Sequence, residues 1–201
     1  MARIDWLVVG GAVEPWERIG LTVVDGTVPL FGTGIRIDPT LPPGLARWQL
    51  SGIADDVSSI DGVPTDVVAP ATPILVEHRC GAIGLDHVVV TTDSLERTCG
   101  AITDATGAPL KRVRELGEIR QGFHRVGGGG LIVEVVERAG LPVGPADLWG
   151  LVINVEDLDL AVAVIGDDSV TAAKPAVQPG RSIATVLDDV GLGVPVALMT
   201  P

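Results

Sequence analysis

The sequence is poor in cysteine and has no long hydrophobic run. Its two cysteines, Cys80 and Cys99, form no C-x-x-C pair and are too few for a disulfide framework in 201 residues, so we expect a reducing, cytoplasmic environment. No apolar stretch approaches the roughly 20 residues that span a bilayer, and the apolar run that follows Asp5 is too short for a secretory signal. We therefore expect a cytoplasmic protein without a membrane partner.

Basic residues are also scarce, because 14 Lys and Arg face 26 Asp and Glu, for a formal net charge of -12. Binding to nucleic acid through its phosphates needs a basic face. The composition supplies no obvious one, so we expect no nucleic-acid partner.

Several common catalytic and nucleotide-binding motifs are missing as well. The glycine run 127–130 is not followed by Lys-Ser/Thr or by a helical pattern, so it is not a phosphate loop. Neither H-E-x-x-H nor G-x-S-x-G occurs in the sequence.

The composition nevertheless indicates a folded, strand-rich protein. Hydrophobic residues make up 46% of the chain and charged residues 20%. The 26 glycines and 15 prolines separate short runs rich in Val, Leu and Ile, which is typical of many short strands joined by turns.

The most informative pattern is an internal repeat. Residues 85–137, moved forward by 63 positions, fall on residues 148–200 without a gap. Identical pairs include Leu85 and Leu148, Val89 and Val152, Leu95 and Leu158, Asp104 and Asp167, Gly117 and Gly180, and Gly128 and Gly191. Matched turn glycines and apolar positions at a fixed offset indicate a duplicated structural unit.

Each copy predicts a strand, a helix and three further strands. In the first copy, residues 84–138, we expect strands at 85–91, 110–116, 119–126 and 131–137, with a helix from about 93 to 106. In the second copy, residues 147–201, we expect strands at 148–155, 170–177, 182–187 and 194–200, with a helix at 156–165. A short link, residues 139–147, joins the two βαβββ modules.

This α+β arrangement of tandem βαβββ modules resembles the glyoxalase/bleomycin-resistance/dioxygenase superfamily, also called the vicinal oxygen chelate superfamily. The resemblance covers residues 85–201 and implies a cup-shaped mixed sheet that binds a small organic molecule. It also implies metal ligands on the first and fourth strands of each module. A divalent metal (Zn, Mn, Fe, Ni or Mg) would then assist a lyase, an isomerase or epimerase, or a dioxygenase.

Two residues of the first copy match the ligand positions of that superfamily. His87, in Leu85-Asp86-His87-Val88, matches the first-strand ligand, and Glu134, in the strand 131–137, matches the fourth-strand ligand. A lone carboxylate within a hydrophobic strand is costly unless it is paired, hydrogen-bonded or bound to metal. We predict that His87 and Glu134 are the catalytic residues and the metal ligands.

The second copy breaks this pattern, because the offset of 63 carries His87 to Gly150 and Glu134 to Ala197. Neither residue can bind a metal. A cup that binds no metal is therefore an equally good interpretation. Its function would then be non-catalytic ligand binding or sequestration, of the bleomycin-resistance type.

Three further residues are candidates for contact with the ligand. If residues 127–130 form a four-residue loop, Phe123 and Arg125 share the face of Glu134, and a slip of one residue would reverse this. Arg125 could then bind a substrate carboxylate. Trp149 could add stacking surface, although a role in the core is the alternative.

The N-terminal part predicts a β-rich module, residues 1–53, followed by a linker, residues 54–83, with one strand at 74–77. Residues 4–9 resemble 85–90, which suggests an eroded βαβββ unit; an ordinary β-rich extension is the alternative. In the first interpretation Gln49 takes the place of Glu134 and is a further candidate metal ligand. Cups need paired modules, so an unpaired third module predicts a homodimer.

Overall fold

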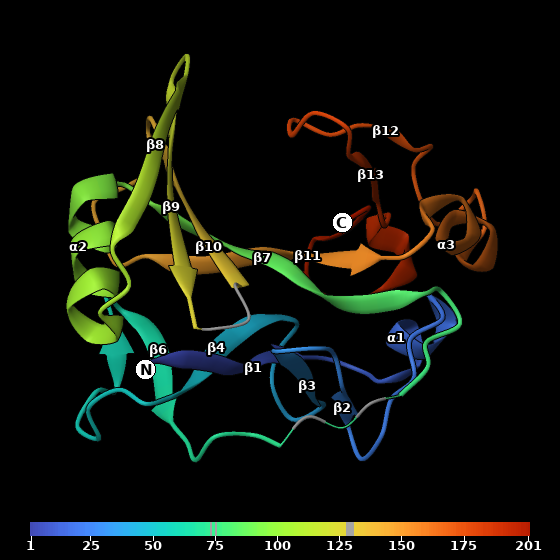
Figure 1. The fold of residues 1–201 in the computed structure, drawn as a ribbon, viewed down its shortest axis with the longest axis horizontal. Coiled ribbons are helices and arrows are strands. Elements are labelled where there is room, and N and C mark those ends of the chain that lie inside the picture. Colours follow the sequence, from blue (N-terminus) through green and yellow to red (C-terminus); the bar gives the residue numbers. More distant parts are fainter. Residues whose placement is uncertain (73, 75, 128–130) are drawn as a thin grey trace.

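The protein has an α+β fold with two mixed β-sheets, one of six strands and one of eight. The computed structural model describes residues 1–72, 74, 76–127 and 131–201. Figure 1 shows the smaller, N-terminal sheet lying beneath the larger sheet. No helix in the described part of the chain is long and apolar enough to cross a bilayer.

The eight-stranded sheet contains both predicted modules. The first module consists of β7 (Ala82–Thr92), α2 (Leu95–Thr106), β8 (Leu110–Leu116), β9 (Ile119–Val126) and β10 (Leu131–Arg138). The second consists of β11 (Asp147–Val155), α3 (Leu158–Ile165), β12 (Lys174–Pro175), β13 (Ser182–Thr185), a 3-10 helix (Asp188–Val190) and β14 (Val196–Met199). The strand order is β12-β13-β14-β11-β7-β10-β9-β8.

Strand pairing confirms the duplication. The two first strands, β7 and β11, are antiparallel neighbours at the centre of the sheet. Each also pairs in parallel with the last strand of its own module, β7 with β10 and β11 with β14. His87 lies opposite Val152, and Val89 lies opposite Gly150. The offset of 63 relates His87 to Gly150 and Val89 to Val152, so it converts each pair into the other. The repeat found in the sequence is therefore an approximate two-fold symmetry of the sheet.

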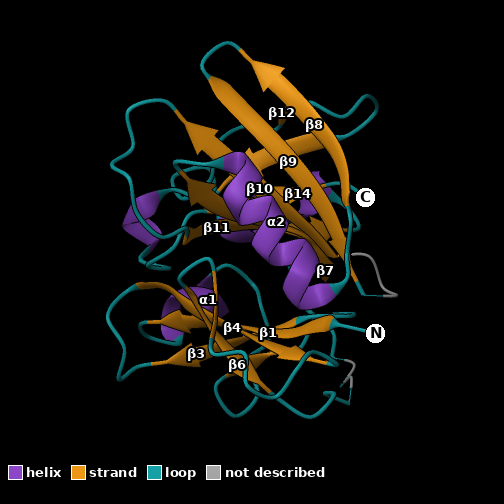
Figure 2. Ribbon diagram, turned by 90° about the vertical axis from the view of Figure 1, so that its left-hand side faces the viewer, coloured by secondary structure: helices purple, strands orange, loops and turns teal. Residues whose placement is uncertain are grey.

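Local sequence explains where the two helices begin and end. The Ser94 side chain accepts a hydrogen bond from the backbone N–H of Arg97, and α2 ends at Gly107, which adopts a left-handed conformation with φ of 69°. In α3 the Asp157 side chain caps the backbone N–H of Leu160. Figure 2 shows α2 crossing the outer face of β9 and β10, so the opposite face of the sheet is left open as a cup.

The six-stranded sheet is built from the N-terminal part of the chain. Its elements are β1 (Arg3–Gly10), α1 (Glu14–Arg18), β2 (Thr27–Val28), β3 (Gly34–Asp38), β4 (Gly44–Ser51), β5 (Ser59–Ile60) and β6 (Val63–Val67). The strand order is β2-β3-β1-β4-β6-β5. The region 54–83, predicted to be a linker with one strand, therefore contributes both β5 and β6. The strand expected at 74–77 is not found at Ile74, Val76 or Glu77, and Leu75 lies outside the described residues.

The pairing within this sheet differs from the single eroded module expected at residues 1–53. The strand parallel to β1 is β3, whereas β4 is antiparallel to β1. In turn, β6 is parallel to β4. The small sheet thus repeats the central arrangement of the large one, with two antiparallel first strands, each flanked by a parallel partner.

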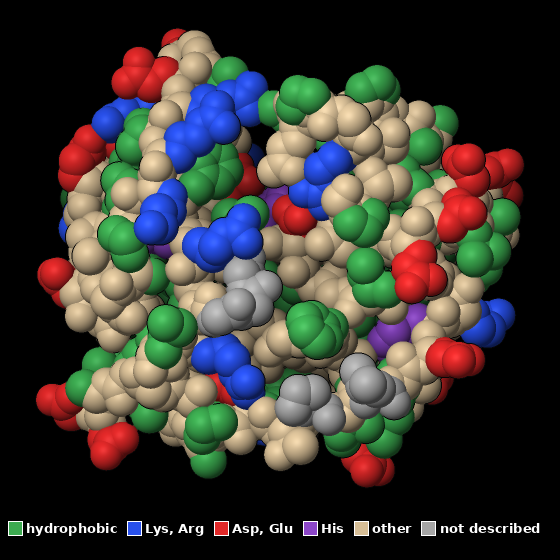
Figure 3. All heavy atoms as spheres, in the orientation of Figure 1, with side chains coloured by type: hydrophobic (Ala, Val, Ile, Leu, Met, Phe, Trp, Pro, Cys, Tyr) green, Lys and Arg blue, Asp and Glu red, His purple; other side chains and the backbone are tan. Residues whose placement is uncertain are grey.

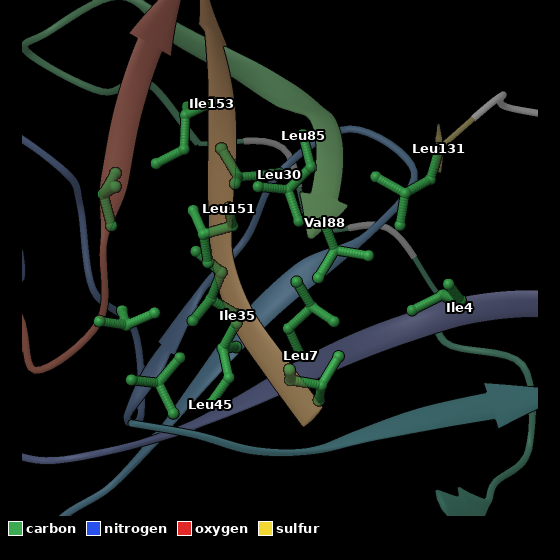
Figure 4. Close-up of a cluster of buried hydrophobic side chains, with 14 of the residues drawn as sticks. Ile4, Leu7, Leu30, Ile35, Leu45, Leu85, Val88, Leu131, Leu151 and Ile153 are labelled. Atoms are coloured by element: carbon green, nitrogen blue, oxygen red, sulfur yellow. The ribbon is translucent and has the colours of Figure 1, made fainter. Parts of the chain in front are cut away.

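A shared hydrophobic core joins the two sheets. Figure 4 shows Leu7 and Ile35 of the small sheet directed towards Val88, Leu151 and Ile153 of the large sheet. The five side chains are almost completely buried. Because this core occupies one face of the large sheet, His87 of β7 and Glu134 of β10 lie on the other face, inside the cup.

Candidate functional site

A cavity of about 430 Å³ lies inside the cup of the large sheet. Its walls come from β7 to β10 of the first module and from the region of β12 to β14 of the second. In Figure 1, β8 to β10 rise on one side of β7 and β11, and β12 and β13 rise on the other. The volume falls within the range of about 300–1,000 Å³ usual for small-molecule sites.

The register of β9 and β10 decides which side chains face the cavity. Glu134 lies opposite Phe123, and Ile132 lies opposite Arg125, so these four side chains share the cup face. This is the arrangement that a four-residue loop predicts, although residues 128–130 themselves lie outside the described residues. His124 points to the other face, where it is buried and its Nδ1 is 3.0 Å from the backbone oxygen of Ala108.

Glu134 is the only acidic side chain among the residues that line this cavity. Gln121 Nε2 donates to its Oε1 over 2.5 Å, and its Oε2 is 3.4 Å from His87 Nε2. Burial raises the pKa of Glu134 above its ordinary value, against the lowering effects of His87 and Gln121. The carboxyl group therefore holds a proton more readily than an exposed glutamate does.

His87 is held from its other side by Asp86, whose Oδ2 is 2.7 Å from His87 Nδ1. Asp86 Oδ1 accepts hydrogen bonds from Arg181 at 2.8 Å and from Asn154 at 3.3 Å. Burial alone would raise the pKa of Asp86, but the hydrogen bonds from His87 and Arg181 outweigh it and lower the pKa to about 2. Asp86 is therefore ionised, and Nδ1 of His87 carries a proton that it donates to Asp86.

This fixed tautomer limits what can lie between His87 and Glu134. With Nδ1 protonated, a neutral His87 presents a lone pair at Nε2 towards a carboxylate oxygen 3.4 Å away. Two unprotonated acceptors at that distance repel each other, so the pair is favourable when it holds one proton. A proton between His87 Nε2 and Glu134 Oε2 would join the two side chains by a hydrogen bond.

Gln121, Asp86 and Arg181 belong to the site but were not predicted from the sequence. Gln121 could have been found, because it lies two positions before Phe123 on the same strand and shares its face. Asp86 could have been suspected from its position next to His87. Arg181 could not, since it comes from the turn before β13 in the other module, 95 residues from Asp86.

The residues present do not fit the four-ligand metal site of the superfamily. A side chain at position 150 has no room, because a Cβ atom on Gly150 would lie 2.8 Å from the backbone oxygen of Pro195. Ala197, the counterpart of Glu134, pairs with Val152 on an apolar wall. Within the described residues no group of three or more His, Cys, Asp or Glu could hold a metal. The donor set consists of His87 and Glu134, and Gln121 already occupies one oxygen of Glu134.

Two of the predicted site residues lie elsewhere. Trp149 is not among the residues that line the cavity, and its ring faces the guanidinium of Arg138 at 5.5 Å. Gln49 lies on β4 in the small sheet, where its Nε2 donates to Asp66 over 3.1 Å. It does not line the cavity, and its strand is not the counterpart of β10. The prediction that Gln49 replaces Glu134 in a third module is therefore wrong.

Comparison with known proteins supports the fold. No family model and no curated protein matches the sequence. Among solved structures, methylmalonyl-CoA epimerase from Mycobacterium tuberculosis is similar, with a TM-score of 0.51 and 18% identity over 60% of this chain and 89% of that chain.

Two weaker similarities have TM-scores of 0.48. One is to methylmalonyl-CoA epimerase from Streptomyces coelicolor, with 17% identity over 58% of this chain and 95% of that chain. The other is to a hypothetical protein from Bacillus halodurans, with 14% identity over 58% and 93%. At 18% identity the similarity to the Mycobacterium tuberculosis structure establishes the fold alone, a tandem arrangement of βαβββ modules.

Proposed function

We propose that this protein binds a small organic molecule in the cup and moves a proton at a carbon next to a carbonyl group, as an isomerase or a lyase does. The observation that carries the proposal is the contact between His87 Nε2 and Glu134 Oε2 at the cavity wall. Both side chains are held from behind, His87 by Asp86 and Glu134 by Gln121. Such support fixes the orientation of acid–base groups.

The reactive form is a Glu134 carboxylate beside a His87 that is protonated on both nitrogens. Glu134 Oε2 removes the proton from carbon, and the electron pair of the broken C–H bond moves to the carbonyl oxygen. His87 donates its Nε2–H to the resulting enolate oxygen, while Asp86 balances the charge of the imidazolium. The step ends when Glu134 returns the proton to carbon and His87 takes its proton back from the enol oxygen. A raised pKa makes Glu134 a stronger base, which favours removal of a weakly acidic proton.

Exchange of hydrogen for deuterium tests this reaction without knowledge of the product. Proton NMR in D₂O with excess EDTA would follow a panel of 2-oxo acids and acyl thioesters. Methylmalonyl-CoA, the molecule in the name of the similar epimerases, would be tried first. We expect the wild type to catalyse exchange with at least one compound, and Glu134→Gln to slow it by about 100-fold or more.

The control is Glu115→Gln, which removes an exposed carboxylate on β8 whose nearest cation, Arg120, is 4.0 Å away. It should leave exchange unchanged. Exchange that persists in Glu134→Gln, or that depends on added divalent metal, would contradict the proposed mechanism. Binding of the panel compounds without any exchange would point instead to a non-catalytic binding protein.

A further inference from the structure

The wall of the cavity formed by β8 and β9 is basic. Lys111, Arg112, Arg114 and Arg125 all line the cavity, and Glu134 is the single acidic residue there. Four cations and one carboxylate give this cavity a formal charge of +3, in a chain whose net charge is -12. Figure 3 shows Lys and Arg side chains gathered along this side of the hollow, whereas acidic side chains dominate other parts of the same face.

These four cations have no carboxylate partner among the described residues. Five arginines elsewhere pair with carboxylates: Arg3 with Asp5, Arg47 with Asp66, Arg97 with Asp61, Arg120 with Glu96, and Arg181 with Asp86. The other four arginines have partners of another kind: Arg18 and Arg79 donate to backbone oxygens, and Arg36 and Arg138 lie over tryptophan rings. In a protein with nearly twice as many acidic as basic residues, a concave surface of unpaired cations favours an anion from outside.

Strand register directs at least three of the cations into the cup. Arg112 lies opposite Phe123, and Arg114 lies opposite Gln121, so both share the face of the residues around Glu134. Arg125 is on the same face of β9. The positive charge of Arg114 also reaches the site, since it is one of the charges that lower the pKa of Glu134.

The opposite wall is apolar. Val177, Ile183 and Met199 line it, and Phe123 and Ile132 add apolar surface near the floor. A ligand that satisfies both walls carries an oxyanion at one end and an apolar body at the other. Planar guanidinium groups bind carboxylate and phosphate oxygens through paired hydrogen bonds.

We infer that the ligand of the cup is an amphiphilic small molecule whose carboxylate or phosphate group is bound by Arg112, Arg114 and Arg125, with its apolar part against β13 and β14. The inference rests on the proposed function in that the ligand occupies the same cup. The inference concerns binding of the anionic group and not the reaction, so binding and proton transfer can be measured separately.

Titration calorimetry with four probes that share a six-carbon chain tests this inference. Hexanoate and hexyl phosphate carry the anion, hexanol is neutral, and hexylamine is a cation. We expect at least one of the two anions to bind ten times or more tightly than hexanol and hexylamine, with an affinity that falls as NaCl rises from 20 to 300 mM. Comparison of the two anions identifies which oxyanion the site prefers.

Four variants locate the site at which the anion binds. Arg114→Gln and Arg125→Gln should each lower the affinity for the more tightly bound anion by roughly tenfold. Arg47→Gln, which removes the same charge from the small sheet, should change its affinity by less than about twofold. Glu134→Gln should bind the anion as well as the wild type or better, because it removes the one negative charge of the cavity.

Equal binding of all four probes, or equal loss of affinity in Arg47→Gln and Arg114→Gln, would overturn the inference. Anion binding without deuterium exchange would leave the inference intact and count against the proposed proton transfer. Exchange confined to uncharged or cationic compounds would support the proposed proton transfer and count against the inferred anion site.

Discussion

Asp86 is a buried carboxylate that links the two modules. It contacts His87 of its own strand and Arg181 of the second module. Both Asp86 and Arg181 have little exposed side chain, with relative exposures of 8% and 14%. An ion pair in such surroundings is costly to break, because the remaining charge stays buried without a partner.

Replacing Asp86 with Asn should therefore lower the free energy of unfolding by about 2–4 kcal/mol at neutral pH. Folding lowers the pKa of Asp86 from 3.8 to about 2. Its contribution is thus present above pH 4 and is lost as the pH falls towards 2. Urea unfolding at pH 7, 4 and 3 should show the difference between variant and wild type shrinking with the pH.

Glu96→Gln is a suitable control for this measurement, because Glu96 also pairs with an arginine, Arg120, but is 70% exposed. Its effect on the urea midpoint should be much smaller than that of Asp86→Asn. A difference between Asp86→Asn and wild type that does not depend on pH would contradict the assigned pKa.

Ionisation of Glu134 should lower the stability of the folded protein, whereas ionisation of Asp86 raises it. Its pKa is raised by burial, so the folded state favours the protonated form, and the wild type loses stability as the pH rises through the folded pKa. Glu134→Gln has no such loss. We expect the melting temperature of the variant to equal that of the wild type near pH 4 and to exceed it at pH 8.

Glu115→Gln again serves as the control, since it removes an exposed carboxylate from the same module. The difference in melting temperature between Glu115→Gln and the wild type should not grow with pH. A stabilisation of Glu134→Gln that is greatest at pH 4 would show that the charged form of Glu134 is favoured in the folded state.

At the scale of elements, the floor of the cup is asymmetric because β11 and β14 pack too closely for a side chain at Gly150. Gly150→Ala should cost about 1–3 kcal/mol, because the new Cβ would lie 2.8 Å from the Pro195 oxygen and the strands would have to move. Gly100→Ala, in α2, meets no atom within 4 Å and should stabilise the protein by about 1 kcal/mol. Thermal unfolding of both variants checks the prediction, which fails if Gly150→Ala is neutral.

The elements of the large sheet could be predicted because their signals are local. Apolar alternation, caps and turn glycines placed the strands and helices of both modules, and the fixed offset aligned them. The last three strands of the second module are shorter than predicted. For β12 the reason is local as well: only Lys174 and Pro175 pair with β13, and Val170 makes an isolated bridge to Val186. Pro175 and Pro179 lack the N–H that a longer ladder would need.

The N-terminal sheet was harder to predict, because its order depends on pairing rather than on pattern. The sequence predicts a strand at residues 45–53, where the structure has β4, but alternation shows only the two faces of a strand and not its neighbours. The structure pairs this strand antiparallel to β1, which removes Gln49 from the candidate site. The contact of Arg181 with Asp86 was missed for the same reason, since it depends on the fold of both modules.

At the scale of the whole molecule, the small sheet changes the basis for the predicted homodimer. The prediction assumed a third module without a partner, whereas β1 and β4 pair within one chain. A different feature now supports it. Strand β8 lies at the edge of the large sheet, and the β8–β9 hairpin exposes Val113, Leu116 and Ile119. Exposed apolar side chains gathered on one hairpin favour association with another chain.

We expect light scattering after size exclusion to give twice the chain mass of 20.7 kDa at micromolar concentration. Val113→Lys should shift the protein to the monomer, because a charge on the edge strand opposes pairing. Val177→Lys, which changes an exposed valine of the second module, is the control and should leave the mass unchanged. A wild-type protein that runs as a monomer would rule out the dimer.

The absence of acid–base side chains at Gly150 and Ala197 has a stereochemical consequence. His87 and Glu134 stand on β7 and β10, and the second module contributes an apolar wall opposite them. For the proposed reaction, the hydrogen therefore leaves and returns on the same face of the bound molecule. Solvent deuterium should enter a stereogenic centre with retention of configuration, so a single enantiomer would become labelled without becoming racemic.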